Sequence, residues 1–220
     1  MTHRIELLHS LQLTPDTKQY IFTKPEGFTF TPGQATDLAI DRDGWRDEAR
    51  PFTFTSDPEA KILSFVIKSY FDHDGVTKAL WSLSAGDHVK IGDPWGAIEP
   101  KGAGIFIAGG AGITPFIPVI DDLAERGQLT GSTLIFANKD HHNIILREHF
   151  AARDGLDCVF VTDDGVNADH AGRLDGDVLG QEIADFDERF YLCGPPAMQE
   201  TVLGYLHAKG VTNDQVVMED

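Results

Sequence analysis

Apolar and polar residues alternate over short stretches in the amino-terminal part of the chain, and this alternation is typical of strands with one buried face. Predicted strands cover residues 4–13, 18–23, 35–40, 51–56, 62–69 and 88–91, with one helix at 76–84. Turn-forming pairs such as Pro32-Gly33 and Asp93-Pro94 separate them. Strands at this spacing favour a small antiparallel β-barrel.

The pattern changes near residue 100, where continuous apolar runs begin to alternate with stretches of helical spacing. Predicted strands cover 104–108, 132–137, 157–162 and 189–193, and predicted helices cover 115–126, 144–152, 178–183 and 197–209. Strands and helices that take turns indicate a doubly wound parallel sheet, an α/β arrangement. We therefore expect two domains, 1–99 and 100–220.

Charge and cysteine content narrow the class of protein. Among 220 residues, 35 Asp and Glu against 18 Lys and Arg give a net charge of −17, which argues against a nucleic-acid partner. No apolar run approaches the ~18 residues of a membrane span, and the first residues lack a leader pattern, so we expect a cytoplasmic protein without a membrane partner. Two cysteines are too few for an iron–sulfur cluster. His141, His142 and His149 lack the other ligands of a closed metal site, and no metal is expected.

A glycine-rich turn joins the first predicted strand and helix of the second domain. Gly110 and Gly112 would let the backbone approach a pyrophosphate, next to the amino-terminal end of the helix dipole. Thr114 is predicted to cap the helix, and Pro115 suits its first position. Taken alone, the turn is also consistent with a tight connection that binds nothing.

A second turn follows the predicted strand at 189–193. Cys193, Gly194 and Pro195 begin it, and Met198 lies in the helix that follows. Ligands of open parallel sheets bind outside the carboxyl ends of the strands, which is where this turn is expected. The spacing leaves two alternatives open for Cys193, a place at the rim of such a site or a small buried residue.

In their order and spacing, these segments resemble the ferredoxin-NADP reductase superfamily, of the flavodoxin reductase kind. The resemblance covers nearly the whole chain and rests on Pro32-Gly33-Gln34, Arg50-Pro51-Phe52-Thr53, Gly75-Val76-Thr77, Gly86-Asp87, the two turns above and Glu219. It implies an FAD-binding antiparallel barrel over 1–99 and an NAD(P)-binding α/β domain over 100–220.

The resemblance implies flavin contacts in the first domain. Arg50 would hold a flavin phosphate, Phe52 would stack on the isoalloxazine, and Thr53 would bond to flavin N5. Phe52 stands where tyrosine is commoner, at the loss of one hydrogen bond worth about 1 kcal/mol or less. The other implied cofactor contacts are Pro51, Lys68, Tyr70, Gly75, Val76 and Thr77. A second phosphate-binding segment at 75–77 favours FAD over FMN.

The resemblance also implies the residues around the nicotinamide. Thr53, Cys193 and Glu219 are expected there as positioning groups rather than as acids or bases. Relatives often end in Glu-x-aromatic, whereas this sequence reads Glu219-Asp220, so a more open nicotinamide face is expected.

Charged side chains are expected to set coenzyme choice. Asp163 would oppose the 2′-phosphate of NADPH and so favours NADH, and Arg173 or Lys139 could reverse this preference.

The implied reaction is hydride transfer from NADH or NADPH to an FAD-bound enzyme that reduces an unidentified electron acceptor. Flavodoxin, ferredoxin, another redox protein and a small molecule all remain open as the acceptor. Two alternatives compete with this interpretation: an electron-transfer subunit of a larger complex without reductase activity of its own, and a nucleotide-binding module without flavin.

Overall fold

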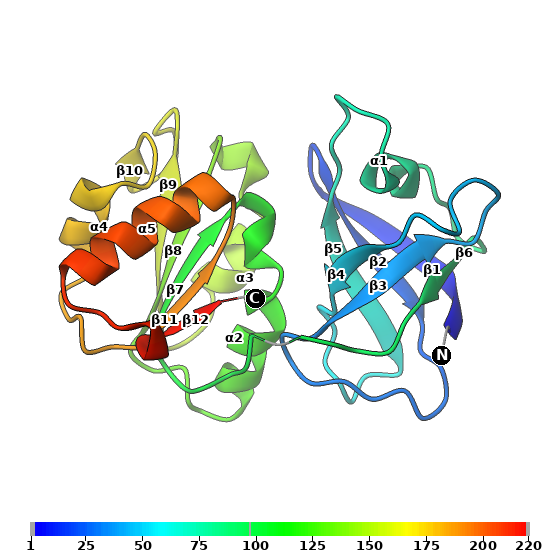
Figure 1. Cartoon of the computed structure of the whole chain (residues 1–220), viewed down its shortest axis with the longest axis horizontal. Coiled ribbons are helices and arrows are strands. Elements are labelled where there is room, and N and C mark those ends of the chain that lie inside the picture. The colour runs from blue at the N-terminus through cyan, green and yellow to red at the C-terminus, as the bar shows by residue number, and fades with distance from the viewer. Residues whose placement is uncertain (1–2, 97, 219–220) are drawn as a thin grey trace. The chain divides into compact units, whose positions relative to one another are not determined.

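The computed structural model describes residues 3–96 and 98–218. The chain divides into two compact units, Met1–Glu99 and Pro100–Asp220 (Figure 1).

The first unit contains a six-stranded antiparallel sheet in the order β4-β3-β6-β1-β2-β5. Its elements are β1 (His3–Thr14), β2 (Thr17–Thr23), β3 (Ala35–Ile40), β4 (Arg50–Thr53), β5 (Ile62–Lys68), α1 (Val76–Trp81) and β6 (His88–Ile91). The long strand β1 pairs with β6 near its start and with β2 along most of its length. The sheet therefore curls around one core, and the predicted antiparallel, barrel-like architecture is confirmed.

Aromatic side chains from several strands fill the core of this unit. Phe54 is fully buried, and its ring stacks on Phe30 at 4.4 Å between centroids and lies 5.2 Å from Phe65. The polar residues next to these rings, Thr53, Thr55 and Ser64, are themselves buried, and the Thr55 and Ser64 hydroxyls bond to each other at 2.8 Å. Leu38 anchors β3 in this core, and β4 pairs with β3 along the edge of the sheet.

The predicted strand at 51–56 is shorter than expected and starts one residue earlier. It ends at Thr53 because the next amides bond elsewhere: Phe54 N–H donates to Gln34, and Thr55 N–H donates to Ser64. The chain thus passes from the β3 side to the β5 side of the sheet at this point.

The second unit contains a six-stranded parallel sheet in the order β10-β9-β8-β7-β11-β12. The strands are β7 (Ile105–Gly109), β8 (Ser132–Asn138), β9 (Leu156–Thr162), β10 (His170–Ala171), β11 (Phe190–Cys193) and β12 (Val216–Met218). The helices are α2 (Phe116–Glu125), α3 (Arg147–Ala151), α4 (Gly176–Glu182) and α5 (Pro196–Ala208), with 3₁₀ helices η1 (Gly110–Ile113), η2 (His141–Asn143) and η3 (Asn213–Gln215). The doubly wound arrangement predicted from the sequence is confirmed.

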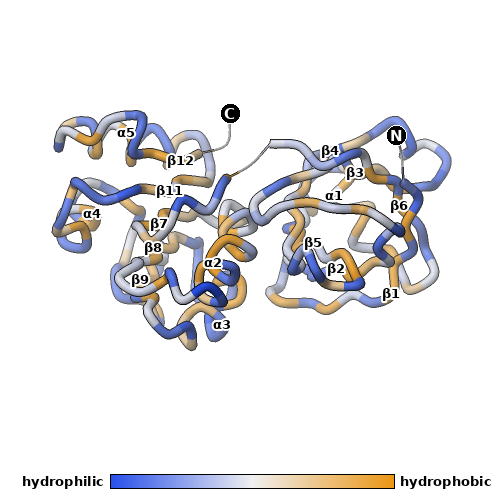
Figure 2. Tube along the Cα trace, turned by 90° about the horizontal axis from the view of Figure 1, so that it is seen from below, coloured by the Kyte–Doolittle hydropathy of each residue, from blue (hydrophilic) through white to orange (hydrophobic). Residues whose placement is uncertain are grey.

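Helices cover both faces of this sheet: α4 and α5 lie on one side, and α2 and α3 lie on the other (Figure 2). On the first side, Leu179 of α4 and Leu206 of α5 pack in one buried cluster with Ile107 of β7. On the other, the rings of Phe106 and Tyr191 stack at 4.3 Å. Every residue of β7 is buried, as expected of a central parallel strand.

Three features of the second unit differ from the sequence prediction. The sequence prediction did not include strands β10 and β12, because two or three residues are too few to show an alternation of apolar and polar positions. Helix α3 begins at Arg147 rather than near 144, since Leu146 before it has a left-handed backbone conformation (φ 53°).

Among the described residues, no helix is both long enough and apolar enough to cross a bilayer.

Candidate functional site

The glycine turn lies at the carboxyl end of β7, but its local structure differs from the prediction. Residues 110–113 form the 3₁₀ helix η1, and α2 begins only at Phe116. Thr114 therefore does not cap α2; its hydroxyl donates to Ala111 O at 3.0 Å. Pro115 precedes the helix instead of opening it. Gly110 has φ +53°, which allows the backbone to turn directly out of the strand.

The two predicted turns of this unit pack directly against each other. A Cβ added to Gly112 would lie 2.3 Å from Cys193 O and 2.7 Å from Gly194 Cα, and one added to Gly109 would lie 2.6 Å from Met198 Sδ. No side chain fits there without moving backbone. Because β7 and β11 are neighbours, both turns share one edge of the sheet. This glycine-lined cradle is compatible with a group that needs close backbone approach, such as a dinucleotide phosphate.

Two aspartates follow the carboxyl end of β9, and their carboxylates differ in hydrogen bonding. The carboxylate of Asp164 accepts hydrogen bonds from Val166 N–H and from the Thr162 hydroxyl, and these bonds hold the pKa of Asp164 below its usual value. Asp163 is exposed, and its backbone N–H donates to Lys139 O at 3.2 Å, while its carboxylate has no partner among the described residues. Of the two, Asp163 therefore has the carboxylate available to an approaching ligand. Arg173 lies just beyond β10 and is also exposed.

One polar side chain at this edge was not singled out from the sequence. Asn138 ends β8, where the strand meets η1, and is 9% exposed; neither of its amide atoms has a hydrogen-bond partner among the described residues. A buried amide without partners is costly, so Asn138 is a further candidate binding residue. The sequence could have indicated this residue, because Asn138 is a polar residue at the carboxyl end of a mostly apolar strand.

The predicted flavin segment forms β4 at the edge of the barrel sheet. Arg50 lies opposite Leu38 and Phe52 opposite Thr36, so Arg50 and Phe52 share one face of the strand. Phe52 packs on the core yet stays partly exposed, and Thr53 is 7% exposed. The exposed Arg50 guanidinium next to a flat ring fits an anionic group joined to an aromatic system.

The remaining barrel candidates cluster around the start of α1. Thr77 connects them, since Tyr70 N–H donates to its hydroxyl at 3.4 Å and the Ser69 hydroxyl donates to its carbonyl at 2.8 Å. The Tyr70 ring is 47% exposed. Val76 is buried, so only its backbone could touch a ligand. Lys68 is held by an ion pair with Asp16 at 3.2 Å.

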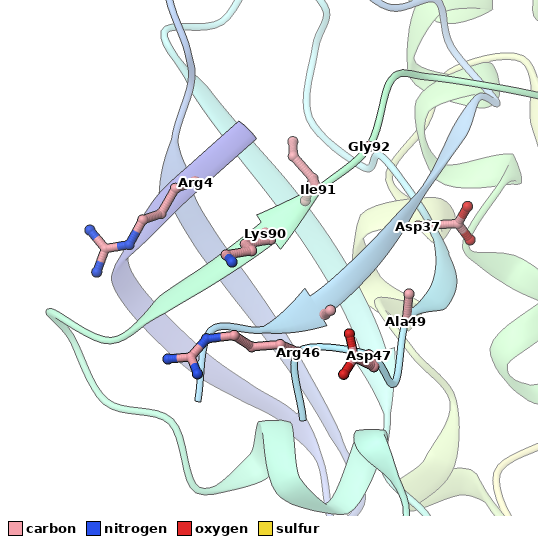
Figure 3. A pocket seen from close by; sticks show the side chains of 9 residues that line it. Arg4, Asp37, Arg46, Asp47, Ala49, Lys90, Ile91 and Gly92 are labelled. Carbon is pink, nitrogen blue, oxygen red and sulfur yellow. The ribbon is translucent and has the colours of Figure 1, made fainter. Parts of the chain in front are cut away.

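A cavity of about 540 Å³ opens on the first unit, lined by the residues shown in Figure 3. These residues are Arg4, Asp37, Ala39, Arg46, Asp47, Ala49, Lys90, Ile91 and Gly92. None of the predicted cofactor residues is among them. Ala39 lies opposite Lys90, and Lys90 lies opposite Arg4, on the face of the sheet away from Leu38 and the core. The cavity is therefore distinct from the Arg50–Phe52 face.

A nearly buried carboxylate organises the cations beside this cavity. The side chain of Asp41 is 12% exposed and accepts from Arg4 Nε at 2.8 Å and Arg46 Nε at 2.7 Å, with Lys90 Nζ at 3.6 Å. The hydrogen bonds from Arg4 and then Arg46 hold the pKa of Asp41 well below its ordinary value. Asp41 thereby ties β1 and β6 to the loop that leads into β4.

This network predicts a pH-dependent loss of stability in Asp41→Asn. A lowered folded-state pKa stabilises the fold above the unfolded pKa, about 3.9 for aspartate, and that stabilisation fades as the pH falls further. The difference in unfolding free energy between the wild type and D41N should be constant near neutral pH and shrink below about pH 4. Urea unfolding across this range measures it. The control Asp43→Asn removes an exposed partner of Arg46 and should cost little; equal losses in both variants would contradict the prediction.

The remaining histidine, cysteine and glutamate candidates lie partly outside these segments. His149 Nε2 lies 2.9 Å from Asp121 Oδ1, and burial raises the pKa of the Cys158 thiol to about 11. No group of three or more potential metal ligands occurs in the described part of the chain. Cys193 ends β11 at the rim of the cradle. Glu219, predicted near the nicotinamide, falls outside the described residues.

The amino-acid sequence is similar to those of known oxidoreductases. The family model for an oxidoreductase NAD-binding domain matches residues 106–203. NADH-cytochrome b5 reductase 2 from Mycosarcoma maydis is 32% identical over 220 residues, and NADH-cytochrome b5 reductase 1 from Aspergillus terreus is 30% identical over 215 residues. The alignments cover 89% and 84% of this chain, and 62% and 71% of the relatives. The chain thus spans about three fifths of the Mycosarcoma protein.

A solved structure is similar over both units. The ferredoxin NADP+ reductase from Neisseria gonorrhoeae with bound FAD and NADP aligns with a TM-score of 0.86 at 21% identity, over 99% of this chain and 98% of that one. At this identity the match shows the shared fold. Together with the relative matched over 71% of its length, it confirms the resemblance found in the sequence: the chain belongs to the ferredoxin-NADP reductase superfamily of flavoprotein reductases.

Proposed function

We propose that this chain is a flavin-dependent NAD(P)H oxidoreductase that binds FAD through residues 1–99 and NAD(P)H, preferably NADH, through residues 100–220. FAD, when bound, supplies the ring that takes hydride from the nicotinamide and passes electrons to an acceptor, so no side chain has to act as a general base.

The close approach of Gly112 to Cys193 and Gly194 is the observation that carries this proposal. It requires glycine at this half-buried edge, so a pyrophosphate would meet backbone rather than side chains as it approaches the η1 amides. Cys193 at the rim would contact the nicotinamide, and Gly194, Pro195 and Met198 at the start of α5 would line the same site. The backbone cradle thus positions the coenzyme.

Residues of the barrel would orient the flavin. Arg50 would neutralise its phosphate and Phe52 would stack on its ring, while the Thr53 hydroxyl would hydrogen-bond to N5. The backbone N–H groups at 75–77 and the Thr77 hydroxyl would receive the pyrophosphate of FAD, and the exposed Tyr70 ring would flank the flavin, with Lys68 close by. Glu219 is proposed near the nicotinamide on the resemblance alone.

Exposed Asp163 supports a preference for NADH. Its carboxylate would repel a 2′-phosphate about 6 Å away by roughly 1 to 3 kcal/mol, a five- to hundredfold discrimination. Asp164 is held within its own turn and contributes less.

Replacing Asp163 by serine should therefore raise kcat/KM for NADPH by roughly five- to hundredfold, with little change for NADH. Steady-state rates with both coenzymes measure this. Asp164→Ser is the local control and should change this ratio less, because Val166 N–H and the Thr162 hydroxyl hold the Asp164 carboxylate inside its own turn. If D163S leaves the NADPH/NADH ratio unchanged, Asp163 does not set coenzyme choice.

The acceptor is proposed to lack a strongly acidic docking face. In the described part of the barrel unit, Arg4, Arg46 and Lys90 surround Asp41, and Arg42 lies 3.5 Å from Asp87. These cations are offset by carboxylates, in a protein of net charge −17. A small molecule or a redox protein that is not strongly acidic fits this surface better than an acidic ferredoxin or flavodoxin.

The proposal is tested by adding FAD to the purified protein and following NADH oxidation with ferricyanide as a general electron acceptor. FAD-dependent turnover is expected. A protein that stays colourless with FAD would instead support a nucleotide-binding module without flavin. Reduction of bound flavin without turnover on any small acceptor would favour the alternative of an electron-transfer subunit.

A further inference from the structure

We propose that Glu48 competes with flavin phosphate for Arg50 and thereby lowers the affinity of the chain for phosphate-bearing flavins. This inference rests on the proposed function, in which Arg50 holds that phosphate. It assigns a role to an acidic residue that lies outside the motif that carries the resemblance.

The contact is an exposed ion pair at the start of β4. Arg50 NH2 donates to Glu48 Oε2 at 3.1 Å, and Arg50 NH1 donates to Ala49 O at 2.7 Å. The two side chains of the ion pair are 53% and 52% exposed. Both terminal nitrogens of the guanidinium are therefore engaged, but only by partners that solvent can reach. An incoming phosphate has to share Arg50 with Glu48 or displace it.

The other arginines of this loop are held elsewhere. Arg46 donates to Asp41 and to Asp43, and Asp41 is almost buried. Arg42 lies 3.5 Å from Asp87, across the turn before β6. Asp41 also pairs with Arg4 and Lys90, which lie on the face of the sheet away from the core, whereas Arg50, the first residue of β4, shares a face with Phe52.

Electrostatics set the size of the effect. A carboxylate and a phosphate that share one guanidinium lie about 5 Å apart, and repulsion at that separation in water-like surroundings changes an equilibrium constant by roughly three- to tenfold. Salt screens exposed charges, so the effect should shrink at high ionic strength. A flavin without phosphate should not experience it.

Asp47 provides a matched control. It is the neighbouring residue, carries the same charge and is exposed, yet forms no ion pair with any residue in 3–96 or 98–218. Its carboxylate lines the cavity on the outer face, and the Arg46 guanidinium points away from it (Figure 3). Asp47→Asn therefore removes an equal charge without releasing Arg50.

The test measures flavin dissociation constants for the full chain after reversible removal of flavin, from the quenching of flavin fluorescence. FAD, FMN and riboflavin are titrated into the wild type, Glu48→Gln, Glu48→Ala and Asp47→Asn at low and high salt. We expect both Glu48 variants to bind FAD and FMN roughly three- to tenfold more tightly at low salt, with riboflavin unchanged and D47N close to the wild type.

Two results would overturn the inference: unchanged FAD and FMN affinity in both Glu48 variants, or an equal gain for riboflavin or for D47N. Thermal unfolding verifies that each variant is folded. Failure of the proposed function has a different signature, because the wild type itself would then bind none of the three flavins.

Discussion

Replacement of Gly112 by alanine is expected to slow NADH-driven flavin reduction by roughly a hundredfold, because misplacement of reacting groups by about 1 Å costs this much. The new Cβ would lie 2.3 Å from Cys193 O and 2.5 Å from its carbonyl carbon, both backbone atoms. The turns after β7 and β11 would have to separate, and this edge is the proposed coenzyme site. Single-turnover reduction of the FAD-bound protein measures the rate.

Gly204→Ala is the control for this substitution. Gly204 lies within α5 of the same unit, and a Cβ there would meet nothing within 4 Å. It should leave the rate unchanged and stabilise the helix slightly. FAD affinity, proposed to reside in the other unit, should survive in both variants. A normal reduction rate in G112A would show that the cradle does not position the coenzyme.

Arg50→Gln is expected to weaken FAD binding by roughly ten- to hundredfold. Hydrogen bonds to charged groups contribute about 1.5 to 3 kcal/mol, and glutamine keeps some polarity but no charge. The loss should be similar for FMN and small for riboflavin, which lacks the phosphate. Flavin fluorescence titration distinguishes these cases.

Arg42→Gln is the matched control, since it removes the same charge from the loop that leads into β4 but breaks the pair with Asp87 instead of the pair between Arg50 and Glu48. Its FAD affinity should remain close to that of the wild type. An equal loss in R42Q and R50Q would mean that only the net charge of the loop matters, and Arg50 would then lose its proposed role.

The pattern of apolar and polar residues was sufficient to predict an antiparallel sheet followed along the chain by a parallel one. Period-two alternation indicated the antiparallel sheet, and the change to buried apolar runs such as Ile105–Gly109 indicated the parallel one. Both fold classes are confirmed. Local details depended on contacts that a linear pattern does not contain. Thr114 and Pro115 were predicted to begin the helix. In the structure Gly110 turns the chain directly out of the strand, so η1 forms first and α2 begins only at Phe116.

The candidate site was predicted unevenly for the same reason. Motif spacing placed Gly112 and Cys193 beyond the ends of two parallel strands, but that these strands are neighbours and that the two turns touch emerges only once β7 and β11 pair. The loop network around Asp41 was not visible in the sequence, since its partners Arg4 and Lys90 come from distant strands. The roles of individual site residues stay predictions.

The central claim is that this chain carries a flavin that NADH reduces directly. Anaerobic rapid mixing of the FAD-bound protein with NADH, followed through the visible absorbance of the flavin, tests it most directly. Bleaching within a single turnover, slower with NADPH than with NADH, is the predicted result. Absorbance that stays constant with both coenzymes, in a folded protein saturated with FAD, would contradict the account.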